Sequence, residues 1–118
     1  MKLVVLKFGG TSVANVSLIK KIASKVKNEV NKDYKVVVVV SAMAGVTNNL
    51  IDLVKSTSTS PPYSEYDVVL SSGEQVTSAL LAIALDNLGI KARSWLGWQV
   101  PIISDLSYGK AVIEEIKT

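Results

Sequence analysis

The protein has 118 residues, of which 48% are hydrophobic and 19% charged, with a formal net charge of +3 and neither cysteine nor histidine. This length allows one small domain, residues 1–118, and the apolar fraction excludes an intrinsically disordered chain. The lack of cysteine and histidine excludes disulfides, thiolate or imidazole catalysis and the usual zinc sites.

Neither a membrane nor a nucleic acid is an expected partner. The longest apolar runs, Val36–Val40 and Ala79–Leu85, are far shorter than the ~18 residues that a bilayer span needs. Lys7 and Gly9 interrupt the N-terminal apolar run too early for a signal peptide, so we expect a cytoplasmic protein. The lysines fit a solvated helix face, and the single Arg93 offers little for reading bases.

The first third of the chain predicts a strand, a helix and a second strand. Residues 2–8 are apolar and β-branched and end at two glycines, which is typical of a buried strand entering a loop. Residues 15–31 carry apolar side chains at intervals of three and four, which predicts an amphipathic helix. Residues 36–40 are apolar without alternation, which predicts a central parallel strand covered on both faces.

A loop over residues 41–49 follows, and apolar residues from Leu50 to Val54 predict a short helix with Thr47 as a plausible N-cap. The Ser-, Thr- and Pro-rich stretch 56–64 predicts an exposed connection. Residues 68–70 fit either the end of a strand or the entry to a helix.

Residues 74–88 predict a largely buried helix, closed by Gly89 in left-handed geometry. Residues 91–97 and 99–104 are typical of strands, and 110–117 of a further possible strand. The alternation of strands and helices predicts an α/β fold, a three-layer α/β/α sandwich with a mainly parallel central sheet.

Three polar segments should meet at the carboxyl edge of this sheet, where ligands of open α/β sheets bind: 7–12, 41–48 and 71–74. In the first, paired glycines let backbone N–H groups approach an anion, and Lys7 adds a full charge. Its spacing matches neither the Walker loop nor the dinucleotide fingerprint, so a tight strand-to-helix turn is an equal alternative.

The other two segments also allow two interpretations each. Ser41 and Thr47 fit either a carboxylate site or a helix cap. Glu74 fits an N-terminal helix cap, or an anchor for an ammonium group or a metal. Trp95 and Trp98 are more typical of a core or an interface than of a base-stacking surface.

Taken together, these segments resemble the opening half of the aspartate kinases, in the amino-acid kinase family with its carbamate kinase-like fold. The resemblance rests on three stretches in order, with further agreement through residues 92–102. They read Lys7-Phe8-Gly9-Gly10-Thr11-Ser12-Val13, then Val39-Val40-Ser41-Ala42-Met43-Ala44-Gly45-Val46-Thr47-Asn48, then Leu70-Ser71-Ser72-Gly73-Glu74.

The resemblance implies ATP-dependent phosphorylation of the side-chain carboxylate of L-aspartate, with Mg²⁺ accompanying ATP. It implies that Lys7 is catalytic and contacts the transferring phosphate, which also lies against Phe8, Gly9 and Gly10. By the same resemblance, Ser41 lies between nucleotide and substrate, Thr47 binds aspartate and Glu74 binds its α-ammonium group. No residue is assigned to a metal.

The family continues with a second half of the kinase domain, and none of its motifs occurs after Ile103. We therefore expect an N-terminal fragment that is inactive alone and that either forms a homo-oligomer or associates with the missing half. Two alternatives stay open: a catalytically inactive remnant or interaction domain that keeps the fold, and another amino-acid kinase.

Overall fold

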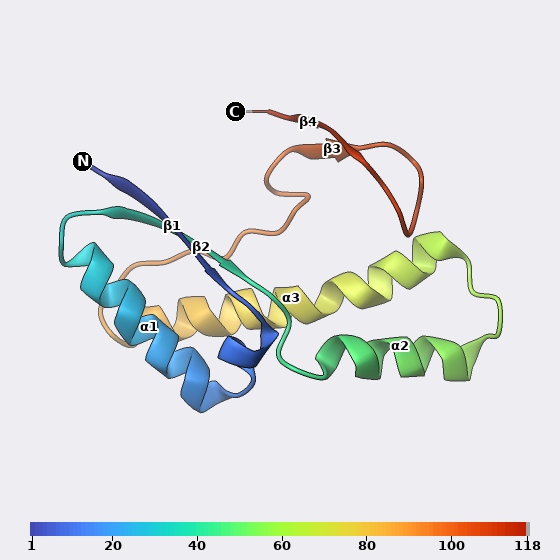
Figure 1. Cartoon of the computed structure of the whole chain (residues 1–118), viewed down its shortest axis with the longest axis horizontal. Helices are drawn as coiled ribbons and strands as arrows, with labels where there is room; N and C mark the ends of the chain where they lie inside the picture. The colour runs from blue at the N-terminus through green and yellow to red at the C-terminus, as the bar shows by residue number, and fades with distance from the viewer. Residues whose placement is uncertain (118) are drawn as a thin grey trace.

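The computed structural model describes residues 1–117 (Figure 1). Its elements, in chain order, are β1 (Leu3–Phe8), the short 3-10 helix η1 (Gly10–Val13), α1 (Val16–Val30), β2 (Lys35–Val40), α2 (Val46–Thr57), α3 (Tyr63–Asp86), β3 (Ile102–Ser104) and β4 (Ile113–Ile116). Figure 1 shows β1 and β2 side by side, α1 and α3 beside them, and β3 and β4 apart near the C-terminus.

The predicted β-α-β unit is confirmed. Strands β1 and β2 pair in parallel, with Leu3 opposite Lys35 and Phe8 opposite Val40, and α1 connects them. The pairing continues one step further, because the Ser41 N–H donates to the Phe8 carbonyl oxygen at 3.1 Å. The segments that follow the two strands therefore leave the sheet at the same edge.

The two faces of this sheet differ sharply in exposure. Inward-facing residues such as Leu6 and Val38 are half-buried, whereas Val5 and Val37 on the opposite face are 62% and 47% exposed. The prediction that β2 is covered on both faces is therefore wrong for residues 1–117. Within this part of the chain, the helices cover one face only, and the second face has no covering layer.

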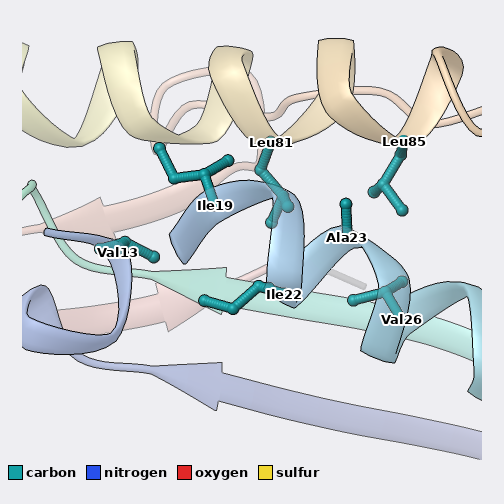
Figure 2. Packing of buried hydrophobic residues seen from close by; sticks show 7 residues of the cluster. All are labelled: Val13, Ile19, Ile22, Ala23, Val26, Leu81 and Leu85. Atoms are coloured by element: carbon teal, nitrogen blue, oxygen red, sulfur yellow. The ribbon is translucent and has the colours of Figure 1, made fainter. Parts of the chain in front are cut away.

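The hydrophobic core lies between α1, α3 and the covered face of the sheet (Figure 2). Figure 2 shows Ile19 and Ala23 on the side of α1 toward α3, and Ile22 and Val26 on the side toward the strands. Its fully or largely buried members are Val13, Ile19, Ile22, Ala23, Val26, Leu81 and Leu85. The apolar spacing in residues 15–31 correctly predicted the core side of α1, although Val16 at its start is 52% exposed.

Helix α3 is continuous over 24 residues and differs from the prediction at its start. Residues 68–70 lie inside it, and the segment 71–74 is helical rather than a loop. Gly73, one residue before the predicted start, is a buried helical residue. The predicted helix end is confirmed, since Gly89 has a φ of +78° and the Ile90 N–H donates to the Leu85 carbonyl oxygen.

By length and composition, α3 is a helix that could cross a membrane, a feature the short apolar runs did not predict. Its buried residues, however, are Gly73, Thr77, Leu81 and Leu85, which pack within the protein. Its C-terminal end is also tied to α1, because the Lys27 ammonium group donates to the Leu88 carbonyl oxygen at 3.0 Å. Packing within residues 1–117 accounts for part of its apolar character only, since Val68, Val76 and Ile83 are more than half exposed.

Residues 91–117 contain less regular structure than predicted. The predicted strand over residues 91–97 is absent, and the strand predictions for 99–104 and 110–117 hold only for β3 and β4. These two strands pair antiparallel, with an irregular register between Ile103 and Ser104, and form a sheet separate from β1 and β2. An extended, apolar segment becomes a strand only where another backbone pairs with it, and 91–96 has no such pairing.

Candidate functional site

The three predicted polar segments meet at Ala42, the second residue after β2. Ala42 is only 4% exposed. The turn after β1 approaches its carbonyl oxygen, and α3 approaches its methyl group and its N–H. Although the third segment is helical rather than a loop, it does reach the other two, as the sequence predicted.

The turn after β1 combines one open and one crowded glycine. A Cβ on Gly9 would meet no atom within 4 Å, so the backbone there is accessible. A Cβ on Gly10 would lie 3.0 Å from the Ala42 carbonyl oxygen, so only glycine allows the two segments to come this close. Lys7, next to last in β1, is exposed beside this turn, whereas Phe8 packs against the core. The arrangement leaves backbone and a cation accessible to an anion.

The segment after β2 turns sharply into α2. Gly45 precedes the helix with a φ of +82°, a conformation that glycine adopts without strain. The prediction of Thr47 as the N-cap is wrong: the N-cap is Gly45, and Thr47 is the second residue of the helix. No side chain caps this end. The half-buried Thr47 hydroxyl therefore lies at an uncapped, electropositive helix terminus that suits a carboxylate.

Glu74 is exposed in the middle of α3, so the helix-cap interpretation of this residue is wrong. Its Oε1 atom accepts a hydrogen bond from the Ala42 N–H at 3.3 Å. This bond is long, and it leaves the other carboxylate oxygen available to a ligand. Glu74 thus places a negative charge at the point where the segment after β2 begins.

Residues 1–117 contain no group of three acidic side chains close enough to hold a metal ion. The site as described therefore offers cationic, backbone, hydroxyl and single-carboxylate contacts, a set suited to binding an anionic or zwitterionic small molecule.

The sequence analysis did not identify Ala42 and Gly73, the two small residues at which the segment after β2 and α3 come into contact. Ala42 and Gly73 carry no chemistry, and both look like ordinary components of their segments. A Cβ on Gly73 would lie 2.9 Å from the Ala42 Cβ. The only signal in the sequence is that small residues occur inside two of the polar segments.

The two tryptophans are exposed residues after α3. Trp95 and Trp98 are 53% and 77% exposed, so the core interpretation is wrong and the interface interpretation stays a prediction. The Arg93 guanidinium lies 4.0 Å from the centre of the Trp95 ring. Arg93 and Trp95 border a cavity of about 680 Å³ between β2, α3 and residues 90–101.

Comparison with known proteins agrees with this arrangement. The model of the amino acid kinase family matches residues 2–118. The chain belongs to the amino acid kinase family. Among curated relatives, an aspartokinase from Rickettsia felis is 54% identical over 121 residues, covering 100% of this chain and 30% of the relative. An aspartate kinase from Stutzerimonas stutzeri is 52% identical and covers 98% of this chain and 28% of the relative.

The fold is also that of a solved family member. The crystal structure of an aspartate kinase from Synechocystis is similar to this structure, with a TM-score of 0.71 and 44% sequence identity. The similarity covers 75% of this chain and 15% of that chain. The α/β amino acid kinase fold is thus confirmed, while this chain spans about 30% of the length of the curated relatives it matches.

Proposed function

We propose that this chain is the aspartate-binding and phosphate-cradling part of an aspartate kinase. The reaction would transfer a phosphoryl group from ATP to the side-chain carboxylate of L-aspartate, giving 4-phospho-L-aspartate, the first step toward lysine, threonine and methionine. The observation that carries the proposal is the meeting of the three segments at Ala42. The names of the curated relatives support the choice of substrate.

The chemistry of such a transfer fits a chain without histidine or cysteine. A carboxylate nucleophile is already ionised at pH 7, so no general base is required. What remains is positioning of the reactants and stabilisation of charge on the phosphoryl group. Lys7 would supply that charge, and the backbone of Phe8, Gly9 and Gly10 would hold the phosphate.

Three further residues would orient the substrate. Ser41 directly follows β2, and its N–H donates to the Phe8 carbonyl oxygen, which supports a position between the phosphate and aspartate. Thr47, at the uncapped start of α2, would bind a carboxylate of aspartate. Glu74 would bind the α-ammonium group, with its second carboxylate oxygen available for that purpose.

ATP with Mg²⁺ is the cofactor we propose, and the residues present fit its phosphates better than its metal. The accessible Gly9 backbone and the exposed Lys7 suit a phosphate, whereas residues 1–117 offer no acidic cluster for the ion. Bound Mg²⁺ neutralises phosphate charge during phosphoryl transfer. This chain would therefore hold the nucleotide through Lys7, Gly9 and Gly10.

Calorimetric titration of the chain with L-aspartate and with Mg-ATP tests the proposal, with N-acetylglutamate as the control ligand. Heat from aspartate, and none from acetylglutamate, would support a preformed substrate site. Binding of neither would overturn the proposed function and favour the alternative of an inactive interaction domain. Preference for acetylglutamate would point to another amino-acid kinase.

The uncovered sheet face supports a proposal about partners. The Cα radius of gyration is 16.1 Å, whereas a compact domain of this length is expected at about 13.5 Å. The apolar residues of the exposed face are Leu3, Val5, Val37 and Val39, and Lys7 and Lys35 lie on the same face. We propose that this face packs against the remaining polypeptide of the kinase, or against a second copy when that polypeptide is absent.

We further propose that the protein acts in the cytoplasm, without a nucleic-acid or membrane partner. The support is the small, scattered positive charge and the packing role of α3.

A further inference from the structure

Helix α3 approaches the segment after β2 unusually closely at Gly73. This residue is buried, and a Cβ built on it would lie 2.9 Å from the Ala42 Cβ and 3.3 Å from Val46 Cγ1. Nonbonded carbon atoms pack at about 3.5–4.0 Å, so any side chain at this position would push the two segments apart. The absence of a side chain at residue 73 is a condition for the observed packing.

The close packing of Gly73 on Ala42 also determines the position of the Glu74 side chain. Glu74 follows Gly73 on the helix, and its Oε1 atom lies 3.3 Å from the Ala42 nitrogen. Hydrogen bonds weaken quickly beyond about 3.2 Å, so this one has little room to lengthen. A shift of α3 by a few tenths of an ångström at Gly73 would break it and move the carboxylate.

Ala42 is also in close contact with the turn after β1. A Cβ on Gly10 would lie 3.0 Å from the Ala42 carbonyl oxygen, so the turn after β1 leaves this segment little freedom to move away. Relief of a clash at residue 73 therefore falls mainly on α3, the element that carries Glu74. Glycine is unfavourable in a helix interior, and the close packing gives a reason for its presence here.

We propose that Gly73 is a positioning residue: its missing side chain lets α3 pack on Ala42 and thereby sets the place of the Glu74 carboxylate. This inference rests on the proposed function only where it links that carboxylate to aspartate. The geometric part stands on the contacts of Gly73, Ala42 and Glu74 alone.

The test compares Gly73→Ala with the double variant Ala42→Gly/Gly73→Ala, which removes the methyl group that the new Cβ would meet. Gly97→Ala is the matched control, because a Cβ there would meet no atom within 4 Å. In each ¹⁵N-labelled chain, NMR records the response of the residue-42 amide resonance to the further substitution Glu74→Ala, which removes the acceptor oxygen. Circular dichroism checks folding, and calorimetry measures L-aspartate affinity.

We expect the residue-42 amide to respond to Glu74→Ala in the starting protein, in Gly97→Ala and in the double variant, but not in Gly73→Ala. Aspartate affinity should fall about tenfold in Gly73→Ala, as for loss of one charged hydrogen bond, and recover to within about threefold in the double variant.

A Gly73→Ala chain in which residue 42 keeps its response to Glu74→Ala would overturn the inference. If Gly73→Ala does not fold, the double variant decides: a folded chain with the response restored supports the inference, and any other result contradicts it. Absence of aspartate binding to the starting protein would overturn the proposed function, while the amide response would still judge the geometry.

Discussion

The two regions of this chain, residues 3–90 and residues 91–117, contain similar apolar segments but bury them very differently. In the first region, α1 and α3 enclose a core with Ile19 1% exposed and Leu81 4% exposed. In the second, Ile113 and Trp98 are 59% and 77% exposed. The difference shows that an apolar strand contributes to a core only where a helix or a second sheet packs against it.

The physical reason is topological. A parallel β-α-β unit brings its connecting helix onto the sheet, whereas β3 and β4 pair only with each other, and an isolated two-stranded sheet is marginally stable in water. The second region is tied to the first by the Gly109 N–H, which donates to Asp67 Oδ2 in α3 at 2.8 Å. It is therefore attached to the folded region without adding to its core.

The largest expected difference between the regions is in stability. Ile19→Ala should lower the free energy of unfolding by about 2–5 kcal/mol, because it leaves a cavity in the core. Ile113→Ala, at an exposed position of the same residue type, should change it by less than about 0.5 kcal/mol. Urea denaturation followed by circular dichroism measures both. Equal losses would show that the second region shares the cooperative core.

Ligand binding should separate the regions next. Lys7→Ala should weaken Mg-ATP binding about tenfold or more, because it removes a charged contact to phosphate. Lys110→Ala is the matched control, since this exposed lysine lies in the turn between β3 and β4. Calorimetry measures both affinities. An unchanged affinity in Lys7→Ala would show that the turn after β1, with Gly9 and Gly10, is only structural.

Self-association should depend on the uncovered sheet face rather than on apolar exposure in general. Val5→Lys should reduce association of the chain at high concentration, because a charge disfavours burial of that face. Ile113→Lys, at a similarly exposed position of the second region, should leave it unchanged. Light scattering over a concentration series gives the result. A monomeric starting protein at high concentration would count against the partner proposal.

The smallest expected effect is a loss of stability in the turn around Asp105, in the second region, at low pH. Hydrogen bonds from the backbone N–H groups of Ser107 and Val112 lower the pKa of Asp105 from its usual 3.8. Since the folded pKa lies below the unfolded one, these bonds stabilise the turn fully above pH 3.8 and lose their effect as pH falls through the lowered pKa.

In NMR spectra recorded at decreasing pH, the Ser107 and Val112 amides should therefore shift together below about pH 4 while the resonance of Ile19 stays constant. Asp105→Asn should abolish this shift. Its persistence in that variant would assign the acid response to another group.

Much of the first region could be predicted because its apolar spacing has a single interpretation. The period of α1 and the unbroken run of β2 correctly predicted both elements, and Gly89 correctly predicted the end of α3. The start of α3 was missed, since the predicted helix began at residue 74 and residues 68–70 were left between strand and helix. Gly73 packs closely on Ala42, 31 positions earlier in the chain, and no local pattern records that contact.

The site was predicted in composition but not in detail. The meeting of the first two segments followed from strand direction, whereas the third reaches them as part of α3. The cap of α2 was predicted wrongly, because Gly45 rather than Thr47 occupies that position. The strand prediction for residues 91–97 was wrong for another reason: the sequence suits a strand, but strand formation needs a paired neighbour.

The most direct test of the account maps L-aspartate onto the ¹⁵N-labelled chain by chemical-shift perturbation. The account predicts that amides of residues 41–47 and of residues 73–74 shift on titration, while those of residues 102–116 stay in place. Perturbations centred on the β3–β4 sheet, or no perturbation at saturating aspartate, would contradict the claim that the substrate site forms around Ala42.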